Sequence, residues 1–313
     1  MDPLIILFGL GVGILVGMTG MGGGSLMTPI LILVFGFKPV TAVGTDLAYG
    51  AVTKTVGGWR HFRQKTVNSS LSTWMALGSV PAAISGVYAL AAIERASGRN
   101  FDGAMLAVLA GALLFTGVAV LARALFLPKL VERERESFVL ERRHKISAVV
   151  LGVFVGFVLG VTSAGSGSLI AVGLILLFHL APRQVVGTDV FHAALLLWAA
   201  AIAHVVAGNV DYALAGTILL GSVPGVWIGT SWSVRVPVAT LRTVLGVVLI
   251  GAGLALAAKA GAGIPTPVIA GIPAVLAAIV CGPPLRAWLR ERRQAAARIQ
   301  VPAPPRHVTA PER

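Results

Sequence analysis

The stretch GMTGMGGGSL, residues 17–26, has a second copy, GVTSAGSGSL, at residues 160–169. Each copy is followed by a proline, then by Val-Gly-Thr-Asp and later by Gly-Ser-Val-Pro, and every landmark recurs 143 residues further on. Residues 9–86 align with the second copy without a gap, and 28 of these 78 positions are identical. A constant offset over this length indicates an internal repeat, and repeats within apolar sequence are a recurring plan of transporters.

The composition of the chain is that of a membrane protein. Of its 313 residues 56% are hydrophobic and only 12% are charged, whereas soluble domains carry about 25% charged residues. The mean hydropathy is +0.88, so we expect lipid to be the solvent. The net charge of +13 lies in short segments between apolar runs, which is typical of topology signals and not of a nucleic-acid surface.

The apolar segments lack the period-two alternation of barrel strands, so we expect helices. Residues 26–35 would span about 15 Å, which is about half of the hydrocarbon core. We therefore predict an all-α polytopic membrane protein of two inverted repeats with glycine-broken or re-entrant helices, plus one terminal helix. This gives about seven full spans and two hairpins. The expected segments are 4–18, 26–35, 43–59, 71–92, 104–126, 146–160, 169–180, 188–207, 212–232, 238–258 and 267–281.

The distribution of Lys and Arg predicts the orientation. Residues 60–65 and 129–145 are basic, which places both in the cytoplasm. The equivalent of the first segment in the second copy, residues 203–208, has no Lys or Arg, so we expect it outside and the two copies inverted. The N-terminus is then outside and the C-terminus cytoplasmic, in the inner or plasma membrane. The resulting parts are repeat 1 (1–127), a charged cytoplasmic loop (128–145), inverted repeat 2 (146–263), a terminal transmembrane helix (264–285) and a basic, proline-rich cytoplasmic tail (286–313).

The two glycine-rich breaks are candidate anion sites. A helix that starts inside the membrane directs free N–H groups and the positive end of its dipole into the protein. Glycines let the backbone approach a ligand, and serines add hydroxyl donors. The alternative is a helix break required only for packing. The candidate substrate-binding residues are Gly22, Gly23, Gly24, Ser25, Gly165, Ser166, Gly167 and Ser168.

The repeated Gly-Thr-Asp places a threonine and a carboxylate in apolar sequence, at Thr45 with Asp46 and at Thr188 with Asp189. Carboxylates within the membrane are candidates for function. We expect Asp46 and Asp189 to couple protons and the two threonines to contact substrate. Both pairs would open a helix, so N-capping is the alternative. His192 follows Asp189 by three residues on the same helix face, which suits a proton relay.

Lys54 is a cation in an apolar helix, and the second copy has Leu197 in its place. It could neutralise an anionic substrate, or its side chain could extend to the surface near Arg60. For His61 and His204, at equivalent repeat positions, we favour interfacial anchoring. The sequence has no metal-binding motif and one cysteine, so we expect neither a metal site nor a cofactor.

These motifs together resemble the TauE/SafE (sulfite exporter, TSUP) family of membrane permeases. The resemblance covers residues 4–281 and is carried by the paired glycine-rich breaks (22–25 and 165–168) and the Gly-Thr-Asp signatures (44–46 and 187–189). It implies transport of small sulfur-containing or organic anions, such as sulfite, sulfoacetate, taurine-derived sulfonates or thiosulfate. Some members use reactive cysteines, whereas Cys281 lies outside both motifs, so no thiol mechanism is carried over.

We therefore expect a permease that moves a small anion by alternating access, with proton coupling, among membrane lipids. A homo-oligomer is compatible with the sequence, and no nucleic acid partner is expected. One alternative is an integral-membrane enzyme, for which only Asp189 and His192 offer chemistry. The other is a membrane scaffold that binds a partner through the charged loop at residues 129–145, where alternating signs are more typical of a solvated helix.

Overall fold

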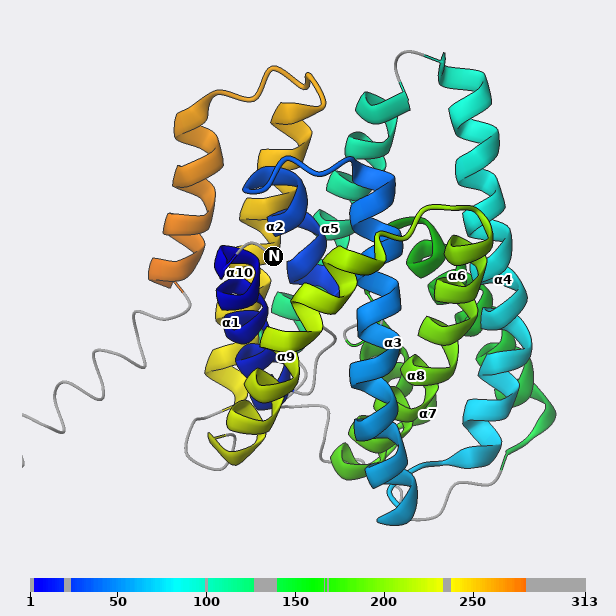
Figure 1. The fold of residues 1–313 in the computed structure, drawn as a ribbon. Coiled ribbons are helices and arrows are strands. Elements are labelled where there is room, and N and C mark those ends of the chain that lie inside the picture. The colour runs from blue at the N-terminus through cyan, green and yellow to red at the C-terminus, as the bar shows by residue number, and fades with distance from the viewer. Residues whose placement is uncertain are drawn as a thin grey trace, which may run out of the picture.

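The computed structural model describes residues 3–19, 24–98, 101–126, 140–165, 167, 169–232 and 238–279. These residues form eleven helices, which run roughly side by side in one bundle (Figure 1). The helices are α1 (Pro3–Thr19), α2 (Gly24–Leu33), α3 (Pro39–Arg63), α4 (Ser69–Ser97), α5 (Phe101–Phe126), α6 (Arg142–Thr162), α7 (Leu169–Phe178), α8 (Pro182–Val206), α9 (Tyr212–Trp232), α10 (Val238–Lys259) and an unlabelled last helix, Thr266–Ile279.

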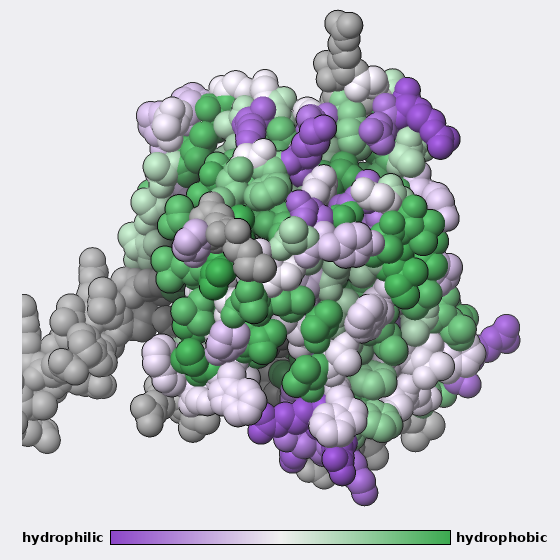
Figure 2. Space-filling model, in the orientation of Figure 1, coloured by the Kyte–Doolittle hydropathy of each residue, from purple (hydrophilic) through white to green (hydrophobic). Residues whose placement is uncertain are grey.

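Five of the described helices are long and apolar enough to cross a bilayer, namely Ser69–Ala96, Phe101–Ala122, Arg142–Thr162, Arg183–Val206 and Tyr212–Trp232. Large apolar side chains cover the outside of the bundle, among them Trp59, Tyr88, Phe115 and Trp227. On the face shown in Figure 2, hydrophobic residues occupy the middle and hydrophilic residues gather mainly toward the upper and lower edges. This distribution is the one that a bilayer requires of a multi-pass protein.

The short segments after the two breaks are confirmed as short helices. Both α2 and α7 have ten residues, so each is about 15 Å long and could not cross the membrane alone. Most predicted segments agree with the observed helices within a few residues. The predicted last segment ends at Cys281, which lies outside the described residues, as does most of the charged loop, residues 127–139. α6 begins at Arg142, within the range expected for the charged loop, so this helix includes the last basic residues of that range.

The helices that carry Gly-Thr-Asp begin earlier than predicted. α3 starts at Pro39 and α8 at Pro182, each after a residue in extended conformation. Proline is favoured in the first turn of a helix because its missing N–H would have no partner there. Thr45, Asp46 and their repeat counterparts therefore lie well inside helices, and the N-cap alternative for them is wrong.

Four helix pairs make the closest packing, α1 with α9, α4 with α6, α3 with α8 and α5 with α10. Glycine ladders bring the first two pairs together: Gly9, Gly13 and Gly17 of α1 lie against the backbone of α9, and Gly152, Gly156 and Gly160 lie against that of α4. Within each of these two pairs the contacts advance in the same direction along both helices, so the helices run parallel. Small residues permit such close approach of backbones.

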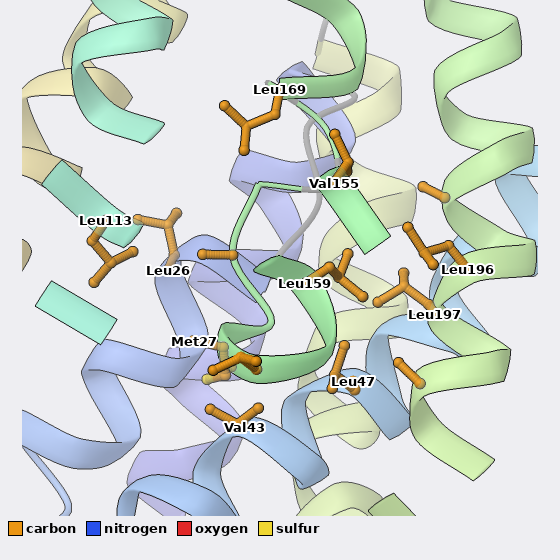
Figure 3. Packing of buried hydrophobic residues seen from close by; sticks show 14 of the residues in the cluster. Leu26, Met27, Val43, Leu47, Leu113, Val155, Leu159, Leu169, Leu196 and Leu197 are labelled. Atoms are coloured by element: carbon orange, nitrogen blue, oxygen red, sulfur yellow. The ribbon is translucent and has the colours of Figure 1, made fainter. Parts of the chain in front are cut away.

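The other two pairs run antiparallel. In α3 and α8, Gly50 lies against Leu197 while Gly58 lies against Phe191. In α5 and α10, Gly253 lies against Leu114 and Gly246 against Leu121 in the same opposed order. Leucine, valine and methionine side chains from the short helices and from α3, α5, α6 and α8 converge between these pairs (Figure 3). The two breaks therefore sit next to the hydrophobic core.

Candidate functional site

The two breaks meet in the interior of the protein. The amide of Gly165, in the second break, donates to the hydroxyl of Ser25, at the start of α2, with an N···O distance of 3.4 Å. Gly165 has a φ of +97°, a conformation that glycine adopts readily and other residues do not. Ser25 and Gly167 are buried. The structure thus brings together two segments that lie 140 residues apart in the sequence.

Four of the predicted binding residues, Gly22, Gly23, Ser166 and Ser168, lie outside the described residues. The helix starts themselves are placed close to the prediction. α2 begins at Gly24, two residues before the predicted segment 26–35, and α7 begins at Leu169, where the predicted segment 169–180 begins. The first N–H groups of both short helices therefore face the region of the breaks, where a helix N-terminus favours negative charge.

Asp46 lies beside the breaks and binds hydroxyls from both halves of the chain. Its Oδ2 accepts hydrogen bonds from Thr28 of α2 at 2.5 Å and from Ser163 after α6 at 2.6 Å. The two hydroxyl oxygens are themselves 2.7 Å apart. The other carboxylate oxygen, Oδ1, and the hydroxyl of Tyr49 are also buried, and Tyr49 interacts electrostatically with Asp46.

Thr28 and Ser163 were not predicted as site residues. Their repeat counterparts are Ala171 and Gly20, so the repeat does not mark them. A signal did exist in their location, because both are hydroxyl residues in apolar sequence within a few positions of a break. Only the packing of α2, α3 and the end of α6 shows that they share one carboxylate.

Thr45 and Thr188 serve the fold in equivalent ways. The Thr45 hydroxyl accepts the backbone N–H of Asp211 at 3.0 Å, and the Thr188 hydroxyl accepts that of Asn68 at 2.9 Å. Asp211 and Asn68 precede α9 and α4, and each side chain accepts an N–H from the first turn of its helix. The two threonines therefore attach the start of a helix from the other half of the chain, which is a structural role that the sequence analysis missed.

Lys54 is buried between α3 and α8, with only 5% of its surface exposed. It interacts electrostatically with Asp189, which is equally buried. The expectation that Lys54 could extend to the surface is wrong, because the close packing of α3 and α8 encloses it. Two charged residues that the sequence analysis treated separately thus lie together inside the protein.

His192 is fully buried and contacts α4 through both ring nitrogens. Nε2 lies 3.1 Å from the hydroxyl of Ser79 and Nδ1 lies 3.5 Å from that of Ser72. Its repeat counterpart is Tyr49, so in each half an aspartate is followed three residues later by a ring with a polar group. Asp189 and His192 both lie in α8, three positions apart, so they are about one helical turn from each other. The predicted proton relay depends on this spacing.

The two repeat-related histidines at helix ends have different environments. His204 is fully buried, with Nε2 3.0 Å from the carbonyl of Gly160 and Nδ1 3.3 Å from the Asn209 side chain. It joins the end of α8 to α6, so its predicted interfacial anchoring is wrong. His61 is only partly buried and contacts Thr66. Across the described residues, no group of three or more His, Cys, Asp or Glu side chains is arranged to hold a metal ion.

A multi-pass helical bundle in which two short helices begin inside the protein, next to buried charges, is typical of membrane transporters. Comparison with known proteins agrees. Residues 5–256 match the family model described as "Sulfite exporter TauE/SafE". The chain belongs to this family, which confirms the resemblance found in the sequence.

Curated relatives are described as probable membrane transporters. The chain is 40% identical over 256 residues to "Probable membrane transporter protein YjnA" of Bacillus subtilis (strain 168), covering 82% of this chain and 100% of the relative. It is 28% identical over 255 residues to "Probable membrane transporter protein YdhB" of the same organism, covering 81% and 99%. No solved structure matches the chain.

Proposed function

We propose that this protein carries small anions, such as sulfite, sulfoacetate or other sulfonates, across the membrane by alternating access coupled to protons. The observation that carries the proposal is the buried meeting of the two breaks, where Ser25 contacts Gly165. The N-termini of α2 and α7 are directed there, and the N-terminus of a helix favours anions. The family description, which names a sulfite exporter, supports the choice of anion.

We infer further that the chain is built of two inverted repeats. Through the offset of 143 residues, α1 is equivalent to α6, and α4 is equivalent to α9. The pair of α1 with α9 therefore corresponds to the pair of α6 with α4, and the helices in both pairs pack parallel. The offset also relates α3 to α8 and α5 to α10, and in each case the two related helices pack antiparallel. Antiparallel equivalents are what an inverted repeat requires. Rocking of the two halves about the meeting point of the breaks would open the site alternately to each side.

Asp46 suits a proton carrier in this scheme. Thr28, Ser163 and Asp46 form three short oxygen–oxygen contacts, but the two hydroxyls provide only two hydrogens. A proton on the carboxyl group would give every contact a donor. Asp189 with His192 is the second candidate for proton coupling, and Lys54 is the residue that would neutralise a bound anion.

The test is uptake of labelled sulfite into proteoliposomes, with and without an inward proton gradient. Unlabelled sulfoacetate, thiosulfate, taurine and chloride serve as competitors. We expect saturable uptake that the gradient stimulates and that Gly167→Leu abolishes by filling the break. Gly216→Leu, at an open position of α9, is the matched control and should retain uptake. Absence of uptake and of competition, by protein shown to be folded, would remove this class of anions.

A further inference from the structure

The two repeat-related aspartates have different neighbours. Asp46 accepts hydrogen bonds from the hydroxyls of Thr28 and Ser163. Asp189 instead interacts with a cation, Lys54. The residue that corresponds to Lys54 in the other half is Leu197, so the equivalent position for Asp46 has no positive charge. At the position of Lys54, the two halves of the site therefore differ by one positive charge.

Lys54 and Asp189 are both more than nine-tenths buried at the interface of two antiparallel helices. Charged side chains are costly in such an environment unless they compensate each other. An anion that enters the protein would also compensate the positive charge of Lys54, as the carboxylate of Asp189 does. Substrate and carboxylate are thus alternative counter-ions of one lysine.

Few other charges act on this pair. Along α3 the ionisable groups nearest to Lys54 are Tyr49 on its N-terminal side, with Asp46 beyond it, and Arg60 and His61 on its C-terminal side. His61 interacts electrostatically with Lys54 and with Arg183 in the first turn of α8. On α8 itself, His192 follows Asp189. α4, packed against α8, presents the hydroxyls of Ser72 and Ser79 and has its own charges only near its C-terminal end; α9, packed against α3, contains none. The cationic groups named here, Arg60, His61 and Arg183, lie on the side of Lys54 that faces the C-terminal end of α3.

We propose, on the basis of the transport function above, that Asp189 is the resident counter-ion of Lys54 and that the transported anion displaces it. The released carboxylate then takes up a proton, because an unpaired carboxylate is unfavourable in this interior. Each bound anion therefore brings one proton. Because one lysine supplies the positive charge, the substrate class is a singly charged oxyanion such as hydrogen sulfite or a simple sulfonate.

The probe is methanesulfonate, whose single charge does not change over the working pH range. Its binding is measured as ligand-induced stabilisation in thermal unfolding of the purified protein, and its transport in proteoliposomes. The variants are Asp189→Asn, Lys54→Leu, which introduces the residue of the second repeat, and the double variant. Asp46→Asn is the matched comparison, because that carboxyl has no lysine to release.

In the unchanged protein, the Kd should rise about tenfold for each pH unit, since the anion-bound state holds one more proton. Asp189→Asn should bind methanesulfonate more tightly at high pH and lose this dependence, whereas Asp46→Asn should not gain affinity. Lys54→Leu should lose binding. The double variant should not bind but should be more thermally stable than Lys54→Leu, because its interior contains no unpaired charge.

The outcomes separate this inference from the proposed function. If sulfite and methanesulfonate are transported but Asp189→Asn keeps the pH dependence of the Kd, the counter-ion role is wrong and the transport function stands. If methanesulfonate binds as expected but no anion is transported, the transport function is wrong and the exchange of counter-ions stands. Tighter binding of sulfate than of methanesulfonate would overturn the singly charged substrate class.

Discussion

At the scale of single residues, Asp46 is the point where the two halves of the chain share one polar group. Thr28 reaches it from the first half and Ser163 from the second, and both hydroxyls contact the same oxygen. Hydrogen bonds to a charged or partly charged acceptor in a dry interior are stronger than those exposed to water. The cluster therefore holds the two breaks together in this conformation.

Removing either hydroxyl should weaken this junction. We expect Thr28→Val and Ser163→Ala each to cost about 1–3 kcal/mol of stability, and the double variant to cost less than the sum because the three groups are coupled. Thermal unfolding in detergent measures the effect. Thr217→Val is the control, since its buried hydroxyl bonds only to the carbonyl of Ala213 within α9. Strictly additive losses, equal to that of the control, would show that no shared cluster exists.

At the scale of helices, the glycine ladders determine how closely the two halves pack. Gly13 lies against the backbone of Ser222, and Gly156 lies against that of Ser79, which is the repeat-related contact. A side chain at either glycine would collide with main-chain atoms, which cannot move aside as a flexible side chain can. The parallel pairs α1 with α9 and α4 with α6 consequently depend on these positions.

We expect Gly156→Ala to separate α4 from α6 and to destabilise the protein by about 1–3 kcal/mol or more. The yield of monodisperse protein and its unfolding temperature report the effect. Gly111→Ala in α5 and Gly216→Ala in α9 are matched controls, because no atom lies near enough to obstruct the added methyl group. Equal behaviour of all three variants would contradict the close packing described here.

At the scale of the whole molecule, the proposed inverted repeat predicts on which side of the membrane two segments lie. Gln64 and Ala207 are repeat-related and follow α3 and α8, which run antiparallel. The basic residues around Gln64 favour the cytoplasmic side, and the segment around Ala207 has no Lys or Arg. The two positions should therefore lie on opposite sides of the membrane.

Single cysteines at Gln64 and Ala207, in a Cys281→Ser background, test this arrangement. A membrane-impermeant maleimide should label Ala207→Cys in intact cells and Gln64→Cys only after the membrane is opened. The reverse pattern would invert the predicted orientation but keep the repeat inverted. Labelling of both positions from the same side would show that the two halves share one orientation.

The sequence alone determined the class of the protein, its family and the positions of most helices. Hydrophobicity and glycine breaks are local properties of the chain, so they mark helices, short segments and the 143-residue repeat without knowledge of the fold. The sequence also identified Lys54, Asp46, Asp189 and His192 as unusual, because polar groups in apolar helices are costly wherever the helices pack.

Only the tertiary structure decided which of these groups meet. Thr28 and Ser163 are 135 positions apart, and their contact with each other and with Asp46 depends on how α2, α3 and α6 pack. The same packing brings Lys54 within electrostatic range of Asp189, buries His204, and makes Thr45 and Thr188 acceptors for backbone N–H groups of the other half. Periodicity relates residues within a few turns of one helix, whereas these contacts join different helices, and so no local pattern contains them.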